Sequence, residues 1–156
     1  MPGQGSISLT SDDSFVLDGR VFSDFAFGDC VLVDFPNDLS HSKASKNGGG
    51  VIAKDEKGNQ ADVTLRLLLG SADDAWLVSR LQQIDNDFAA QTLMTTSFSK
   101  RVGDGTGPSG IKSKVYAGVG GTIKKRPGAK MSSDGDEEQS VAVWVLHFLN
   151  VGEVIQ

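Results

Sequence analysis

The chain has 156 residues and a mass of 16.5 kDa, the size of one domain with a single core. Its net charge of -5, from 20 acidic and 15 basic residues, argues against a protein that binds nucleic acid by neutralising phosphates. One cysteine excludes an intramolecular disulfide and a cysteine-rich zinc site, and its apolar neighbours predict that Cys30 is a buried small hydrophobe. We expect one domain over residues 1–156, with no signal peptide and no membrane span.

Short strands are predicted for the first forty residues. Ile7 and Leu9 alternate with polar residues, and an Asp18-Gly19 pair between two apolar runs is typical of a tight hairpin. Apolar residues at every second position from Phe25 to Phe35 predict a strand with one buried face.

A polar, Gly-rich segment occupies about residues 36–60 and is interrupted only by Val51, Ile52 and Ala53. Segments of this length without a core of their own are unusual inside a compact domain. We therefore expect a long loop or hairpin that projects from the domain and pairs with another chain. The alternative is a surface loop without a function.

One strand and one helix follow. Residues from Ala61 to Leu69 alternate strictly between apolar and polar, which predicts a strand with one buried face. Ser71 is a typical helix N-cap, and Asp73 and Asp74 fall in the first turn, where the helix dipole favours acids. A single apolar stripe at helical spacing then consists of Leu77, Leu81, Ile84 and Phe88.

Three more strands are predicted, over residues 92–102, 115–123 and 141–149. The last of them is apolar at both odd and even positions, so both of its faces should be covered. The chain has barely enough secondary structure to cover both, which indicates help from a neighbouring subunit. The predicted fold is mainly β with one flanking α-helix.

No motif predicts catalysis, a cofactor or a metal site. Gly105, Gly107 and Gly110 have the spacing of a dinucleotide-binding loop, but Pro108 interrupts it and a strand-like pattern follows where a helix is required. His41 and His147 lack a second ligand at metal-binding spacing. We therefore predict that the chain is not an enzyme.

Two clusters of opposite charge precede the last strand. Lys124, Lys125 and Arg126 form a basic cluster with Lys130, and an acidic run extends from Asp134 to Glu138. The acidic run lacks the spacing of a calcium loop, so we interpret it as solvated. The basic cluster suits either a phosphate or an acidic run on a neighbouring copy, and the acidic balance of the chain favours the neighbouring copy.

This layout resembles the tail tube (inner tube) proteins of contractile-tailed bacteriophages over residues 15–150. The resemblance lies in the Gly-rich segment that runs into Gly58-Asn59-Gln60 and in the strand-to-helix sequence ADVTLRLLLGSADDAWLVSRL. It continues in VYAGVGGTIKKRPGAK, the acidic loop and the Trp-bearing strand VAVWVLHF.

The resemblance implies that the antiparallel strands form a β-sandwich or barrel-like domain. It also implies six copies in a ring whose inner strands join into one β-barrel, with rings stacked into a hollow tube. The implied partners are the protein itself and the tail sheath, tape-measure, baseplate and tail-terminator proteins. DNA would pass through a neutral or acidic lumen without specific binding. The implied location is the tail of the virion, with assembly in the host cytoplasm.

Residues are assigned on this basis. The predicted lumen-facing side chains are Asp62, Thr64 and Arg66, and the arginine needs a neutralising acid if it is not to hold DNA. The predicted subunit and ring contacts are His41, Lys43, Lys46, Val51, Ile52, Lys54, Lys124, Lys125, Arg126, Asp136, Glu137 and Glu138.

Two other classes remain open. A tail-terminator or adaptor protein, or a head decoration protein, would use the same β-sandwich without forming a tube. A carbohydrate-binding sandwich needs exposed aromatic side chains near polar loops, whereas Trp76 lies in the predicted helix and Trp144 in the most apolar strand.

Overall fold

The structure is a computed structural model that describes residues 6–7 and 13–156, and it consists mainly of antiparallel strands. An eight-stranded sheet has the order β3-β2-β8-β9-β10-β7-β4, with β1 also paired to β8, and β5 and β6 form a separate two-stranded sheet. The strands of the large sheet are β1 Ser6–Ile7, β2 Ser14–Leu17, β3 Arg20–Val21, β4 Val31–Asp34, β7 Ala61–Leu68, β8 Met94–Gly103, β9 Ile111–Lys125 and β10 Val141–Ile155.

The described residues contain one α-helix, α1 at Ala72–Asn86. Four short 3-10 helices lie at Glu56–Asn59 (η1), Phe88–Ala90 (η2), Pro108–Gly110 (η3) and Glu137–Ser140 (η4). The prediction of a mainly β, antiparallel fold with one α-helix is confirmed.

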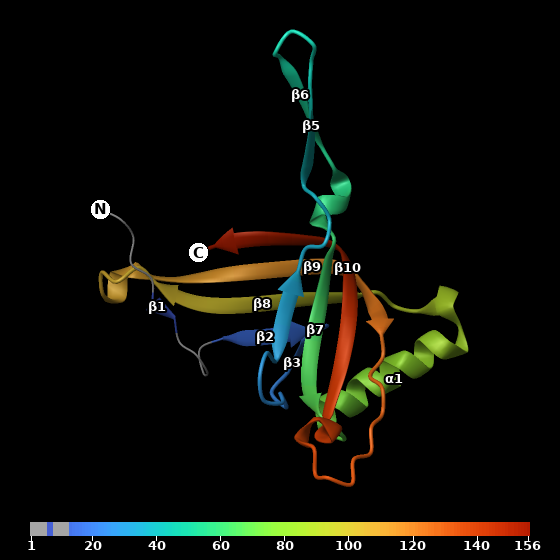
Figure 1. Cartoon of the computed structure of the whole chain (residues 1–156). Coiled ribbons are helices and arrows are strands. Elements are labelled where there is room, and N and C mark those ends of the chain that lie inside the picture. The colour runs from blue at the N-terminus through green and yellow to red at the C-terminus, as the bar shows by residue number, and fades with distance from the viewer. Residues whose placement is uncertain (1–5, 8–12) are drawn as a thin grey trace.

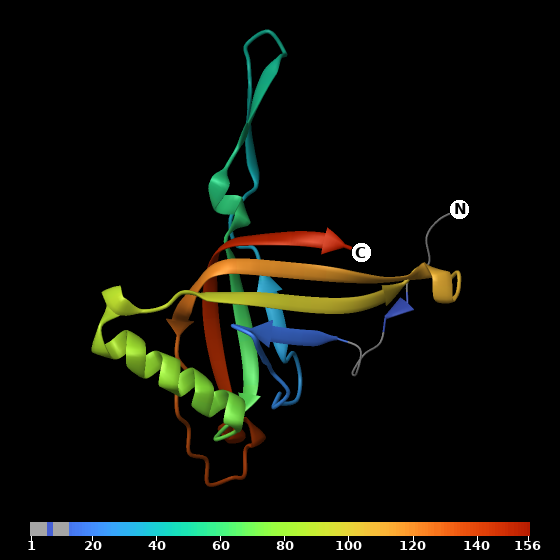
Figure 2. The same cartoon turned by 180° about the vertical axis from the view of Figure 1, so that it is seen from behind.

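The large sheet folds over on itself because its long strands bend. Strand β10 pairs with β7 over residues 141–148, but over residues 150–155 it pairs with β9 alone. As a result β4, β7 and the first half of β10 run across the direction of β2, β8 and the second half of β10 (Figures 1 and 2). The far halves of β8, β9 and β10 continue sideways as an arm beyond this crossing (Figure 1).

The core fills the space between the two crossing layers. Fully buried residues from β2, β7 and β10 meet in one cluster, which includes Phe15, Leu17, Leu65, Trp144 and Phe148. Two glycines of β9 make this packing possible: a Cβ on Gly121 would lie 2.2 Å from the Phe148 ring, and one on Gly118 would lie 2.9 Å from Thr96. The ring of Phe148 therefore lies directly on the backbone of β9.

Two buried carboxylates attach the helix to the sheet. Ser71 caps α1, as predicted. Asp73 accepts hydrogen bonds from Arg20 Nε and from the backbone N–H groups of Ser23 and Asp24. Asp74 accepts one from Trp144 Nε1 at 2.8 Å in the core. The sequence predicted only a helix-dipole role for these acids, because their partners are about 50 and 70 residues away in the chain.

The predicted tight hairpin is confirmed at Asp18 and Gly19. Both residues have positive φ, 53° and 83°, as a type I′ turn requires. The predicted final three strands are present: β9 and β10 are longer than expected, and β8 is close to the expected length. The position predicted for Leu9 lies outside the described residues.

Three expectations need correction. The strand predicted from Phe25 to Phe35 is only Val31–Asp34, because Gly28, with a φ of 82°, turns the chain before it, and Cys30 at this turn is half-buried rather than buried. The helical stripe ends at Ile84, since α1 stops at Asn86 and Phe88 is exposed in η2. The pattern of β10, by contrast, agrees with the expectation: one face is buried, and Val143 and Val145 on the other face are half-buried in the single chain, which leaves room for a neighbouring subunit.

Candidate assembly interface

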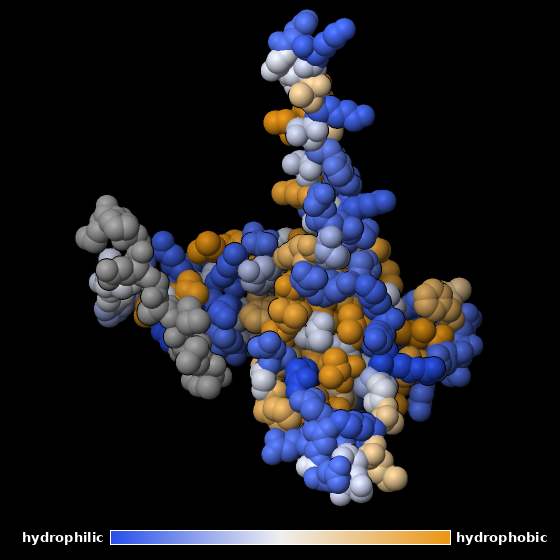
Figure 3. Space-filling view, in the orientation of Figure 1, coloured by the Kyte–Doolittle hydropathy of each residue, from blue (hydrophilic) through white to orange (hydrophobic). Residues whose placement is uncertain are grey.

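The β5–β6 hairpin (Ser40–Ala44 and Gly50–Lys54) projects away from the rest of the molecule (Figure 1). All ten of its strand residues are exposed, including Val51 at 69% and Ile52 at 80%. Figure 3 shows these apolar side chains on a thin and mainly hydrophilic projection. An isolated two-stranded hairpin is marginally stable in water, so this one is suited to contact a partner.

The hairpin presents different chemistry on its two faces. Cross-strand pairing places His41 with Ala53 and Lys43 with Val51 on one face. Ile52 pairs with Ser42 on the opposite face. A partner that covers both apolar side chains must therefore contact both faces of the hairpin.

The base of the hairpin is fixed by Asp55, which the sequence did not single out. Its carboxylate accepts a hydrogen bond from the Lys57 backbone N–H at 3.0 Å and contacts His41 Nε2 at 2.8 Å. The hydrogen bond with His41, followed by that from Lys57, lowers the pKa of Asp55. His41 thus has a partner within the chain, whereas Lys43, Val51 and Ile52 face solvent.

The residues predicted to face a lumen share the outer face of β7. Asp62 contacts His147 Nδ1 at 2.7 Å and Lys124 Nζ at 2.8 Å. Partial burial raises the pKa of Asp62, but the hydrogen bonds with Lys124 and His147 outweigh it, so the net pKa is lower than usual. Thr64, two residues along the strand, is half-buried.

Arg66 is neutralised within the chain by an acid that the sequence analysis assigned elsewhere. Its Nη2 donates to both carboxylate oxygens of Glu138, at 3.0 and 3.2 Å, and its Nε donates to the Phe27 carbonyl at 3.2 Å. The guanidinium also lies 5.4 Å from the centre of the Phe27 ring. Arg66 therefore joins two loops across the outer face of the sheet.

Some charges of the two clusters that were predicted to pair between subunits are paired within the chain, and others are not. Lys124 pairs with Asp62, Lys130 with Asp136 and Arg66 with Glu138, all within one chain. Lys54 at the base of the hairpin is 3.9 Å from Glu56. The side chains of Lys125, Arg126 and Glu137 are exposed and form no ion pair with another described residue. Lys46 is exposed in the turn of the hairpin.

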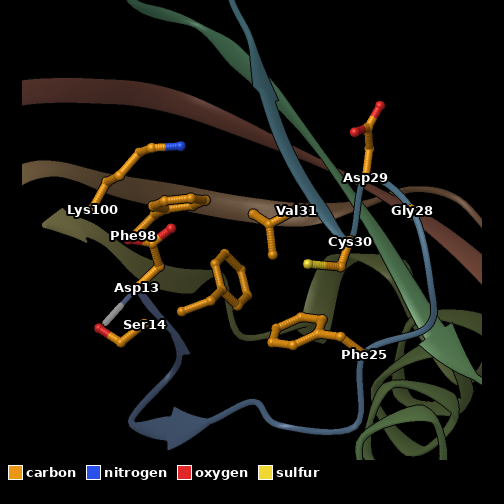
Figure 4. A pocket seen from close by; sticks show the side chains of 10 residues that line it. Asp13, Ser14, Phe25, Gly28, Asp29, Cys30, Val31, Phe98 and Lys100 are labelled. Carbon is orange, nitrogen blue, oxygen red and sulfur yellow. The ribbon is translucent and has the colours of Figure 1, made fainter. Parts of the chain in front are cut away.

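An open pocket of about 280 Å³ lies between β2, β4 and β8. Figure 4 shows the side chains of Phe25, Cys30, Val31 and Phe98 around it, with Lys100 at the rim. Among the described residues there is no group of three or more metal-ligating side chains, and none of the described helices is long and apolar enough to cross a membrane.

No protein-family model matches the sequence, and no curated protein is significantly similar to it. Two solved structures share its fold over nearly the whole of both chains. The tube-terminating cap of the anti-feeding prophage (AFP) is 11% identical with a TM-score of 0.60, covering 100% of this chain and 95% of the cap. The sheath/tube terminator of PVC, an extracellular contractile injection system, in its extended state is 10% identical with a TM-score of 0.56, covering 96% of each chain.

Proposed function

We propose that this chain is a ring-forming terminator that ends the tube of a contractile tail or contractile injection system. One observation carries the proposal: the fold matches two tube-terminating proteins almost from end to end, without a missing or additional domain. The role is structural rather than enzymatic, and the contacts are made with further copies and with the end of a tube and its sheath.

The exposed surfaces are consistent with such a role. The hairpin offers apolar side chains to a neighbour on two faces, and the apolar outer face of β10 is half-covered in the single chain. Exposed apolar groups of this kind mark protein–protein contacts in soluble proteins. We place the hairpin at the contact between the ring and the tube.

The tube subunit remains a second candidate, because the two ends of the molecule differ in a way that suits stacking. The hairpin projects from one end, and the loop of residues 126–140 lies at the opposite end (Figure 1). Stacked copies would bring the hairpin of one ring to the loop end of the next. The terminator is preferred since both similar structures are terminators.

Imaging the purified protein distinguishes these candidates. Mass photometry and negative-stain electron microscopy of a terminator should give single rings that do not grow into longer assemblies as the concentration rises. Long hollow filaments would establish a tube subunit instead. A well-folded protein that stays monomeric at high concentration, without any partner, would contradict both.

A further inference from the structure

We propose that neighbouring copies join through opposite edges of one four-stranded layer, β4–β7–β10–β9, with an acidic edge on one copy meeting a basic edge on the next. The inference rests on the proposed ring-forming function. It specifies which edges meet and what chemistry selects them.

The two edges are open in the described part of the chain. Strand β4 pairs with β7 on one side and with no described strand on the other. At the other end of the layer, β9 residues 122–125 pair with β10, whereas the pairing of β9 with β8 stops at Gly121. Exposed edges of this kind pair with another chain unless they are protected.

Strand direction allows the edges of identical copies to meet. Each neighbouring pair in the order β4–β7–β10–β9 is antiparallel, so β4 and β9 run in opposite directions at the two edges (Figure 1). Rotation about an axis roughly along the strands keeps these directions. The β9 edge of one copy therefore meets the β4 edge of the next in antiparallel orientation, and the alternation continues around the ring.

Charge is segregated between the two stretches of sequence that contain the edges. Residues 21–42, which include β4, contain four aspartates and no lysine or arginine. Residues 105–133, which include β9, contain six lysines or arginines and no acid. The whole chain is acidic, so a basic stretch of this length is not a consequence of its composition.

Several charges at or beside the edges lack partners among the described residues. Asp34 lies directly opposite Asp62 in the sheet, an arrangement of like charges that is unfavourable unless cations compensate it. Lys124 and His147 compensate Asp62, but the exposed Asp34 carboxylate has no hydrogen bond or ion pair with any described residue. Asp29 on the acidic edge, and Lys125 and Arg126 on the basic edge, are exposed and likewise lack an ion pair among the described residues.

An edge-to-edge contact between copies brings these groups together. The registers of the layer put Lys125 level with Leu32, so Lys125 and Arg126 then face the stretch between Asp29 and Asp34 of the next copy. The wrong contacts, acidic edge against acidic edge and basic against basic, are disfavoured by repulsion. The two edges thus select a head-to-tail ring over a symmetric dimer.

Charge exchange tests this inference in the full chain. The variant Asp29→Lys/Asp34→Lys has two basic edges, and Lys125→Glu/Arg126→Glu has two acidic edges. Each alone should raise the concentration for half-assembly by more than about tenfold, measured by mass photometry. Mixing the two variants should restore assembly, because every contact in an alternating ring again joins opposite charges. The fourfold variant, with both edges exchanged, should assemble alone.

Two single-site controls carry the same kinds of charge reversal away from the edges. Asp85→Lys in α1 and Lys112→Glu in the arm are exposed and should leave the concentration for half-assembly within about twofold of the wild-type value. Circular dichroism verifies that each variant is folded.

If both edge variants form rings at the same concentration as the wild type, this inference is overturned and the terminator function is left intact. Failure of the mixture to reassemble from two folded variants would also overturn it. A wild-type protein that forms no ring would overturn both proposals.

Discussion

Asp73 accepts three hydrogen bonds at the start of the helix, from Arg20 and from two backbone N–H groups that follow β3. Its side chain is almost fully buried, at 2% exposure, so water cannot replace the carboxylate. Asp73→Ala should therefore lower the free energy of unfolding by about 3 kcal/mol. Urea denaturation measures the loss. Asp73→Asn, which keeps one acceptor oxygen, should lose less, and a negligible loss in Asp73→Ala would show that the carboxylate's hydrogen bonds are unimportant.

Asp62 makes the stability dependent on pH in the acid range. Its pKa in the folded chain lies below the ordinary value of 3.8, so its charged form contributes stability above about pH 4. That contribution is lost as the pH falls through the lowered pKa. Asp62→Asn should cost about 1 kcal/mol at neutral pH and progressively less below about pH 4.

Thermal unfolding of Asp62→Asn and wild type across this pH range checks the prediction. The control is Asp85→Asn in α1, since that exposed carboxylate has no ion pair among the described residues and lies away from Asp62. It should change the melting temperature little at any pH. If the difference in melting temperature between wild type and Asp62→Asn is the same from acid to neutral pH, the ionisation of Asp62 does not control the stability.

At the scale of elements, the packing of β10 against β9 depends on Gly121, which nothing in the sequence distinguishes from the other glycines. A Cβ on Gly121 would lie 2.2 Å from the Phe148 ring, which is fully buried and cannot move aside. Gly121→Ala should lower the free energy of unfolding by about 3 kcal/mol through overpacking. Gly152→Ala is the matched control, because its Cβ would meet nothing within 4 Å. Chemical denaturation should give near-wild-type stability for Gly152→Ala, and a similar result for both variants would contradict the packing argument.

Elements that depend on local signals were predictable, whereas their partners were not. The Asp18-Gly19 turn, the Ser71 cap and the alternation of β7 are each set by neighbouring residues, and all three are present. The roles of Asp73, Asp74 and Glu138 depend on groups about 50 to 72 residues away, which no local pattern encodes. The Phe25–Phe35 strand failed because alternation continued through Gly28, where the backbone turns.

For the candidate interface, the sequence predicted which segment projects from the domain. It did not predict which charged side chains remain free to contact a neighbouring subunit. Residues 36–60 stood out through composition alone. The pairing of Lys124 with Asp62 and of Arg66 with Glu138 removes part of the charged set predicted for contacts between subunits. These pairs form because strands distant in the chain lie next to each other in the sheet, so only the folded structure separates the internally paired charges from those at the edges.

Across the whole molecule, ring closure and attachment of the ring to a tube occupy different surfaces. The β4 and β9 edges belong to the body, whereas the hairpin projects beyond it (Figure 1). The hairpin strands are fully exposed and contribute nothing to the buried core. A substitution in the hairpin should therefore affect attachment without changing folding or ring closure.

The variant Val51→Asp/Ile52→Asp places a charge on each face of the hairpin. We expect its melting temperature to stay within about 1 °C of wild type, because both side chains are exposed, at 69% and 80%. Rings should still close, but they should no longer attach to tube ends, since each buried carboxylate would be desolvated without a partner. Negative-stain imaging with and without purified tubes measures the attachment of rings to tube ends. Ser42→Asp, on the less apolar strand of the hairpin, is the control for the effect of charge alone. Loss of the rings themselves would show that the hairpin also closes the ring, and normal attachment would remove it from the contact.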